Sequence, residues 1–194
     1  MAREVLEKLI YVYEIEKNTT SGIATGTSKR LELEPDLGLF WKSVSECTSL
    51  RLVTHGTFLA KLASSVFGSL AIAFDLIYLR VCNPGRFTHI HCDYPFFTRF
   101  TEKVMTMWIP LCDIPAELGP IFFVKGSHKF KDHLKATKGF DLMKQKNRKA
   151  NLLDHPAEYA EQRETTLLTA DFKAGDVLLF NMYIQHGSFQ NYSQ

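Results

Sequence analysis

The sequence lacks the features that mark nucleic-acid-binding, membrane and secreted proteins. Its 194 residues carry 23 basic and 21 acidic side chains, a formal net charge of +2, whereas a dedicated nucleic-acid binder usually has a strong basic excess. Apolar runs such as Leu70–Ala73 and Leu76–Leu79 are far shorter than the roughly 20 residues of a membrane span. The N-terminus is acidic and has no apolar signal core. We therefore expect a cytoplasmic protein that binds neither nucleic acid nor membrane.

Several common motifs are also missing. The four cysteines, at positions 47, 82, 92 and 112, form no CxxC and no close pair, so neither zinc-finger spacing nor a disulfide framework is present and reduced thiols are expected. No GxSxG, HExxH, Walker-type or GxGxxG motif occurs, which argues against several enzyme classes. Hydrophobic residues make up 45% of the chain, enough for one sizeable core in a single domain.

Hydrophobic periodicity predicts helices at the beginning of the chain and strands after them. Helical spacing covers 3–17, 40–47 and 57–67, with Gly68 as a stop, and a polar loop covers 18–28. Alternating or β-branched runs predict strands over 71–81, 86–94, 104–111, 121–124, 165–169 and 177–184. We expect one domain over 1–194, with N-terminal helices in 1–68, a mainly β barrel or sandwich over 69–194, and a helical or loop insertion over about 129–164.

The insertion has an uneven distribution of charge. The interval 125–149 holds nine Lys or Arg against two acids, and 154–164 is acidic. One interpretation is a solvated insertion whose halves partly neutralise each other. The other is a basic lid that attracts an anionic substrate. If the lid interpretation holds, reversing the charges of Lys144, Lys146 and Lys149 should raise the KM for such a substrate.

One histidine–aspartate pair has the spacing of a metal site. The segment 88–93 reads Thr-His-Ile-His-Cys-Asp, and because strand side chains alternate, His89, His91 and Asp93 are expected on one face and Cys92 on the other. An imidazole and a carboxylate on a strand can hold a metal from one side, and the 2-His-1-carboxylate triad of non-haem iron oxygenases adds one more His. A metal-free, hydrogen-bonded polar pair is the alternative.

A later segment supplies a candidate for the third ligand. The turn at Gly175-Asp176 leads into an apolar strand, which runs on to Gln185-His186-Gly187-Ser188. His186 stands at the mouth of this strand, about 95 residues after His91, where it could complete the triad across a barrel. Taken alone, His186 would more often be a surface residue.

The order of these segments resembles the phytanoyl-CoA dioxygenase family of Fe(II)/2-oxoglutarate oxygenases. That family's pattern runs from His-x-Asp through a Trp-containing strand and an Asn-Gly-x-Leu…Pro-Gly-Ser-His segment to Gly-Asp and then His-Gly-Ser…Asn. This chain departs from it at Leu118, where the family has Asn, and at Lys125, where it has Pro. Here the middle of the pattern is Trp108–Asp113, Leu118–Ile121 and Lys125–Lys129. The resemblance covers about residues 70–194 and implies a double-stranded β-helix, a jelly-roll or cupin-like barrel, with a metal at its open end.

The resemblance also implies roles for particular residues. His91, Asp93 and His186 would hold Fe(II), and Trp108 and Ser188 would lie beside or help to hold the cosubstrate 2-oxoglutarate. The implied enzyme is a dioxygenase that uses O2, hydroxylates a small or medium organic substrate and releases succinate and CO2. Without the resemblance, the tryptophan could equally be barrel core and the serine a turn hydroxyl.

Two other outcomes stay open. The family places an arginine, which pairs with the far carboxylate of 2-oxoglutarate, about ten residues past the distal His, a position beyond Gln194. Either the chain is a fragment, or another basic residue substitutes, or cosubstrate binding is impaired. The alternative function is therefore a catalytically silent metal-binding module that acts in binding or sensing.

Halogenases of this superfamily carry Ala or Gly where this chain has Asp93, which argues against halogenation.

The remaining histidines are not expected to bind metal. His89 is interpreted as a rim or supporting residue, and His128 as a structural hydrogen-bonding residue. No role is assigned to His55, His133 and His155.

Overall fold

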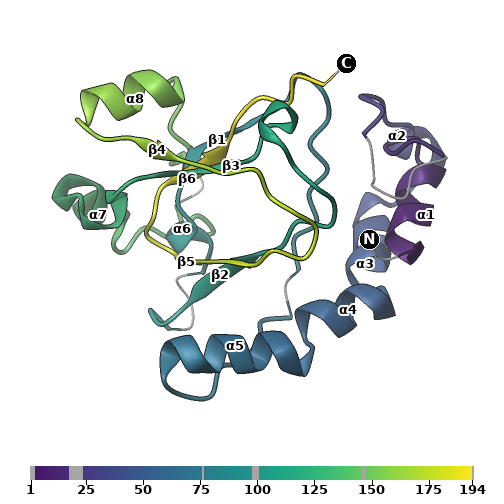
Figure 1. Cartoon of the computed structure of the whole chain (residues 1–194), viewed down its shortest axis with the longest axis horizontal. Coiled ribbons are helices and arrows are strands. Elements are labelled where there is room, and N and C mark those ends of the chain that lie inside the picture. Colours follow the sequence, from purple (N-terminus) through teal and green to yellow (C-terminus); the bar gives the residue numbers. More distant parts are fainter. Residues whose placement is uncertain (1–2, 18–23, 76, 98–100, 146, 194) are drawn as a thin grey trace. The chain divides into compact units, whose positions relative to one another are not determined.

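The computed structural model describes residues 3–17, 24–75, 77–97, 101–145 and 147–193. It divides into two compact units, an N-terminal unit over Met1–Asn83 and a C-terminal unit over Pro84–Gln194. Helices make up the first, and the second combines strands with flanking helices (Figure 1). Within the described ranges, none of the helices has the length and apolar character needed to cross a membrane. The single domain expected over 1–194 stays a prediction.

The N-terminal unit confirms two predicted helices closely and shortens a third. Its helices are α1 (Arg3–Tyr11), α2 (Arg30–Leu33), α3 (Leu37–Ser45), α4 (Thr48–Thr54) and α5 (Thr57–Phe67). Helix α5 has the predicted bounds, and Gly68 ends it in the left-handed conformation that glycine adopts without strain. Helix α3 begins three residues before the predicted start, because Asp36 caps it by accepting a hydrogen bond from the Leu39 N–H. Neither α2 nor α4 was predicted.

Helix α1 ends at Tyr11, six residues before the predicted end. The chain turns at Tyr13, whose φ is 63°, and Ile15 then pairs with Ala24 in an isolated bridge. Val12 and Ile15 are nevertheless buried. The apolar residues after Tyr11 therefore reflect burial of the chain in the core of this unit and not a continuation of the helix. The part of the predicted loop over 18–23 lies outside the described residues.

The C-terminal unit contains two antiparallel sheets. Its strands are β1 (Thr88–His91), β2 (Met105–Trp108), β3 (Ile121–Val124), β4 (Leu167–Leu168), β5 (Leu178–Asn181) and β6 (His186–Ser188). Four of them form a sheet in the order β1-β6-β3-β4, and β2 pairs with β5 in the second sheet. The prediction for 121–124 is confirmed to the residue, and the other confirmed strands are shorter than predicted at both ends.

Two fold expectations need correction. The described residues of 71–81 form no strand, and Ile72 and Tyr78 are 85% and 76% exposed. Their β-branched and aromatic composition is insufficient, because a strand also needs a neighbour for its backbone hydrogen bonds. The expectation of a mainly β chain also needs correction, because the described part has more residues in helices than in strands. Its two antiparallel sheets form no closed barrel there, and the jelly roll stays a prediction.

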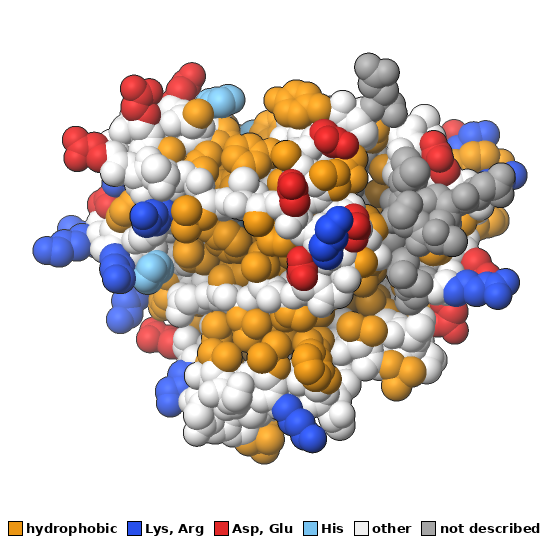
Figure 2. Space-filling model, viewed as in Figure 1, with side chains coloured by type: hydrophobic (Ala, Val, Ile, Leu, Met, Phe, Trp, Pro, Cys, Tyr) orange, Lys and Arg blue, Asp and Glu red, His pale blue; other side chains and the backbone are white. Residues whose placement is uncertain are grey.

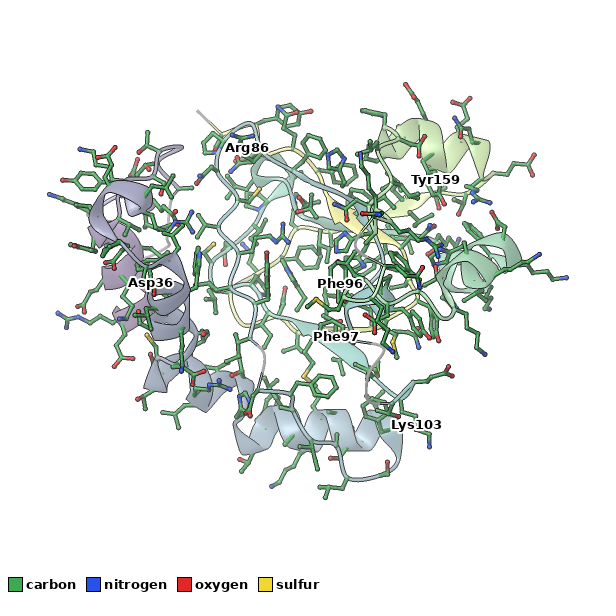
Figure 3. All side chains as sticks on the ribbon, turned by 180° about the vertical axis from the view of Figure 1, so that it is seen from behind. Asp36, Arg86, Phe96, Phe97, Lys103 and Tyr159 are labelled. Atoms are coloured by element: carbon green, nitrogen blue, oxygen red, sulfur yellow. The ribbon has the colours of Figure 1, made fainter. Side chains whose placement is uncertain are left out.

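Alternation along β3 builds a core on each side of the larger sheet. Ile121 packs with Phe172 and Phe180 on one side. Phe122 and Val124 pack with Tyr159 on the other. Tyr159 lies on the side of α8 (Pro156–Gln162) that faces the sheet (Figure 3). The sheet is thus covered on both faces where β6 runs beside β3.

The insertion is partly helical, as expected. It contains α7 (Lys131–Thr137) and α8, and the preceding residues form the short 3-10 helix η2 (Ser127–Lys129). Basic side chains gather over α7 and acidic ones over α8 (Figure 2). Arg163 of the acidic half pairs with Asp132 of the basic half at 2.6 Å, so the halves neutralise each other at one point. Lys146 lies outside the described residues, and the lid stays a prediction. The two remaining short helices are α6 (Tyr94–Phe97) and η1 (Ala116–Leu118).

Candidate metal centre

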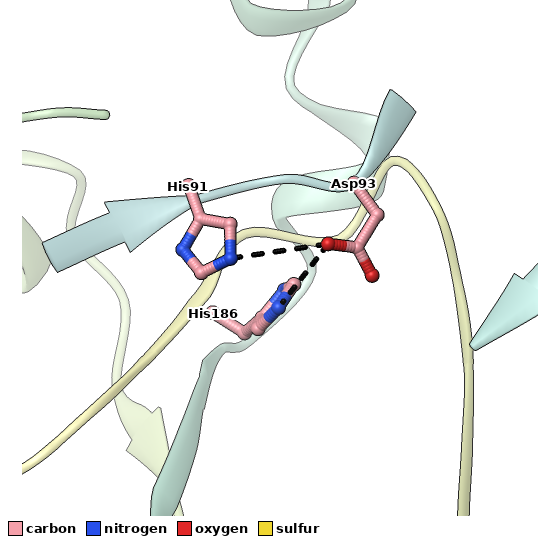
Figure 4. Close-up of side chains that lie close together, drawn as sticks. All are labelled: His91, Asp93 and His186. Carbon is pink, nitrogen blue, oxygen red and sulfur yellow. Dashed lines mark ion pairs between the residues drawn. The ribbon is translucent and has the colours of Figure 1, made fainter. Parts of the chain in front are cut away.

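Strand pairing brings the two predicted ligand segments together. Strand β1 pairs antiparallel with β6, and His91 and His186 are opposite one another across the pair. Asp93 follows β1 by two residues, at a bend. The three side chains point toward one another from the two strands (Figure 4). Pairing of segments that are distant in sequence therefore assembles the predicted group.

The distances within the group suit one shared ion. Asp93 Oδ1 lies 3.8 Å from His91 Nε2 and 3.7 Å from His186 Nε2. One ligand atom from each residue can be chosen so that all three lie within 4.8 Å of one another. Bonds from imidazole nitrogen and carboxylate oxygen to zinc are about 2.0–2.2 Å long, so two donors of one such ion are at most about 4.4 Å apart. Both Asp–His separations fall below that limit.

Backbone carbonyls set the orientation of both imidazoles. His91 Nδ1 lies 2.9 Å from the carbonyl oxygen of His89, and His186 Nδ1 lies 3.1 Å from that of Ile184. A carbonyl can only accept, so each Nδ1 carries the proton in these contacts. In a neutral ring protonated at Nδ1, Nε2 is the nitrogen that can bind a metal, which is the usual arrangement of histidine ligands.

Apolar rings and one hydroxyl enclose the group. The His186 ring lies 4.8 Å from that of Phe180 and 6.0 Å from that of Phe123, and Thr106 Oγ1 donates to Asp93 Oδ2 at 2.5 Å. The side chains of His91, Asp93 and His186 are 14%, 13% and 7% exposed. The three side chains are therefore largely shielded from solvent.

The predicted geometry of the first segment is correct only in part. The β1–β6 register shifts between Thr88 and His91, so strict alternation does not hold, and His89 is outside the three-residue group. The His89 ring packs against Phe87 instead, with centroids 4.8 Å apart. Cys92 is buried, and burial raises the pKa of its thiol to about 11, so it stays protonated at neutral pH.

The two residues predicted to contact the cosubstrate have other contacts in the structure. Trp108, in β2, packs edge-on against Phe172 with centroids 5.0 Å apart. Ser188, in β6, accepts a hydrogen bond from the Thr88 N–H at 2.8 Å. Because alternate residues share a strand face, Ser188 and His186 lie on the same face of β6. The cosubstrate roles of Trp108 and Ser188 stay predictions.

Sequence reasoning missed a buried polar network next to His186. Tyr159 donates to Gln185 Oε1 at 3.0 Å, the Gln185 N–H donates to Ser127 Oγ at 2.8 Å, and Gln185 Nε2 lies 3.4 Å from His133 Nδ1. His133 is thus structural, whereas His128 is exposed. A glutamine directly before a strand-end histidine was the available signal, since it must lie on the opposite face from His186.

Comparisons with known proteins give a family and a fold. The family model of phytanoyl-CoA dioxygenase (PhyH) matches residues 47–194. Among solved structures, one match is the epimerase SnoN in complex with Fe3+, alpha ketoglutarate and nogalamycin RO, at 22% identity and a TM-score of 0.51 over 75% of this chain and 54% of that one. Another is SnoK, a non-heme alpha ketoglutarate dependent carbocyclase from nogalamycin biosynthesis, at 21% identity and a TM-score of 0.51 over 79% of this chain and 56% of that one.

These structural matches bear on the fold alone, because their sequences are distant. The chain spans little more than half the length of either structure. A comparison with curated proteins found no match.

Proposed function

The chain belongs to the phytanoyl-CoA dioxygenase family, and from that premise we propose that it is an Fe(II)/2-oxoglutarate-dependent oxygenase. The observation that carries the proposal is the convergence of His91, Asp93 and His186 from two paired strands. Two imidazoles and one carboxylate on one side of an ion, with the other positions open, are the donor set of non-haem iron oxygenases.

In this proposal the metal ligands are His91 Nε2, His186 Nε2 and Asp93 Oδ1. The donor chemistry and the Asp–His separations of 3.7 and 3.8 Å fit such an ion. Bound iron, with 2-oxoglutarate and O2, supplies the oxidation of an organic substrate and releases succinate and CO2. The chain's own residues orient the two imidazoles through backbone carbonyls and keep bulk water from the site with Phe123 and Phe180.

The cosubstrate is assigned to the face of β6 that carries His186. Ser188 lies two residues further along on this face, where its hydroxyl proton is available to a carboxylate while its oxygen accepts from the Thr88 N–H. Trp108 is assigned to the wall beside the cosubstrate. In this proposal the two sheets are the two halves of a jelly roll, and 1–194 forms one domain.

Hydroxylation of a small or medium organic molecule is the reaction we assign. Asp93 supports hydroxylation, because halogenases of this superfamily carry Ala or Gly at this position and therefore have no carboxylate there. The printed descriptions of SnoN and SnoK name an epimerase and a carbocyclase, so a related oxidation without oxygen insertion is the competing outcome. Mass spectrometry of the product separates the two, since only hydroxylation adds an oxygen atom.

The test is titration calorimetry of 2-oxoglutarate into the Fe(II)-loaded chain under anaerobic conditions, followed by exposure to O2 and measurement of succinate. Binding followed by succinate release supports the proposal. Metal binding without 2-oxoglutarate binding favours the silent metal-binding module, and a chain that binds no metal overturns both functions. His186→Ala should abolish metal binding, whereas the exposed His128→Ala should retain it.

A further inference from the structure

Thr106 lies outside the sheet that carries His91 and His186, yet its hydroxyl reaches the candidate site. Its Oγ1 donates to Asp93 Oδ2 at 2.5 Å. The other oxygen, Asp93 Oδ1, faces the two imidazole Nε2 atoms at 3.8 and 3.7 Å. The carboxylate oxygens therefore have separate roles, one accepting a hydrogen bond and the other facing the site.

This division decides how a carboxylate can bind a metal. A carboxylate binds through one oxygen or through two, and the torsion that exchanges its oxygens is soft. A short hydrogen bond to an ionised oxygen is among the stronger ones in proteins, so it holds Oδ2 away from the imidazoles. Assuming the proposed function, we infer that Thr106 is a positioning residue that makes Asp93 a one-oxygen ligand and so keeps a further coordination position open.

The position of Thr106 is itself fixed by strand pairing. Thr106 lies directly opposite Phe180 in the β2–β5 pair, and directly opposite residues share a sheet face. The Phe180 ring packs on His186 while the Thr106 hydroxyl binds Asp93. One rung of the two-stranded sheet therefore contacts two of the three candidate ligands. Its neighbours Met105 and Met107 belong to the opposite face.

The inference is tested by titrating Co(II) into the metal-free chain and recording both the affinity and the visible absorption spectrum. Removing a hydrogen-bond partner of a metal ligand typically weakens metal binding about 10–100-fold. We expect that loss for Thr106→Val, with an altered Co(II) spectrum as Asp93 rotates. Thr106→Ser, which keeps the hydroxyl, should restore both. Thr169→Val is the matched control, because the Thr169 hydroxyl donates to the Ile121 carbonyl at 2.8 Å, away from Asp93.

Each outcome has one meaning. Wild-type affinity and spectrum in Thr106→Val would overturn the inference, and so would an equal loss in Thr106→Ser, which would indicate packing instead of the hydrogen bond. If thermal unfolding shows that Thr106→Val does not fold, Thr106→Ala removes the same donor with a smaller side chain. Failure of the wild-type chain to bind Co(II) would instead overturn the proposed function.

Discussion

Two carboxylates, the buried Glu14 in the N-terminal unit and the partly buried Asp93 in the C-terminal unit, are held in different ways. In the N-terminal unit, Glu14 Oε1 pairs with Arg30 Nη2 at 2.8 Å and accepts from the Ser28 hydroxyl at 2.8 Å. In the C-terminal unit, Asp93 accepts from Thr106 through one oxygen and faces two imidazoles through the other. Among the described residues, no Lys or Arg forms an ion pair with Asp93.

The difference separates a structural ion pair from a binding site. Taking an ionised carboxylate out of water costs several kcal/mol unless charge and hydrogen bonds compensate. Glu14 receives that compensation from the chain's own guanidinium. Asp93 Oδ1 faces the Nε2 atoms of two imidazoles whose Nδ1 atoms donate to backbone carbonyls. The carboxylate oxygen and the two Nε2 atoms, which can all act as acceptors, therefore face one another. Such an arrangement opposes folding and favours a bound cation.

The comparison is sharpened most by Asp93→Asn, which keeps the shape and removes the charge. We expect metal affinity to fall by more than about 100-fold, because loss of a direct ligand exceeds the 10–100-fold of a supporting partner. The metal-free chain should be as stable as wild type or more so, since the amide can donate to an imidazole Nε2. Co(II) titration and urea unfolding measure the two effects. A large loss of stability without metal would contradict the comparison.

Glu14→Gln is the matched change in the other unit, and the expected effects are reversed. It leaves Arg30 without its carboxylate partner, and breaking a buried pair in this way costs about 2–4 kcal/mol after allowance for partial exposure of the guanidinium. Metal affinity should not change. Urea unfolding followed by far-UV circular dichroism checks the stability, with Glu7→Gln as the exposed control. If Glu14→Gln were as stable as Glu7→Gln, the Glu14–Arg30 pair would not stabilise the fold, and the contrast between Glu14 and Asp93 would not hold.

The sequence predicted the parts of the molecule that depend on local pattern. Helix α5 and strand β3 have their predicted bounds, because a helix cap and a short apolar run can both be recognised from residues that are neighbours in the sequence. His91, Asp93 and His186 were also predicted as a group, since their neighbours resemble a family pattern. Their convergence is the structural finding that local pattern alone could not supply.

The parts that were missed depend on contacts between distant residues. Nothing near Thr106 in sequence indicates Asp93, and the β1 bulge that separates His89 from His91 arises from pairing with β6. The apolar residues over 71–81 predicted a strand that has no partner among the described residues. In each case the outcome depends on whether residues distant in sequence contact one another, which local sequence preferences do not indicate.

Gly187→Ala tests whether packing within the C-terminal unit positions His186. A Cβ at Gly187 would lie 2.6 Å from the Thr88 carbonyl oxygen and 2.8 Å from Phe122 Cζ, because β6 runs between β1 and β3. Overpacking of this kind costs about 1–3 kcal/mol, and displacement of β6 should weaken Co(II) binding at the same time. Gly85→Ala is the control, because a Cβ there meets nothing within 4 Å, although its positive φ adds some backbone strain. Retained stability with lost affinity would contradict the packing explanation.

The smallest expected effect concerns His133, which supports β6 from the side opposite the metal group. Burial lowers the pKa of the His133 imidazole below its usual value, because removal from water disfavours the charged ring more than the hydrogen bond from its Nε2 to the Tyr183 carbonyl favours it. Its Nδ1 faces Thr137 and the Gln185 amide. The unfolded chain therefore binds this proton more readily than the folded one, so the stability contribution is complete above about pH 6.5 and decreases as the pH falls below it. Urea unfolding of the metal-free wild type should show this decrease, and His133→Gln should show less of it, whereas His128→Gln should follow the wild type. An identical pH dependence in wild type and His133→Gln would mean that the titration of this half-buried ring does not contribute to the stability of the unit that carries the metal site.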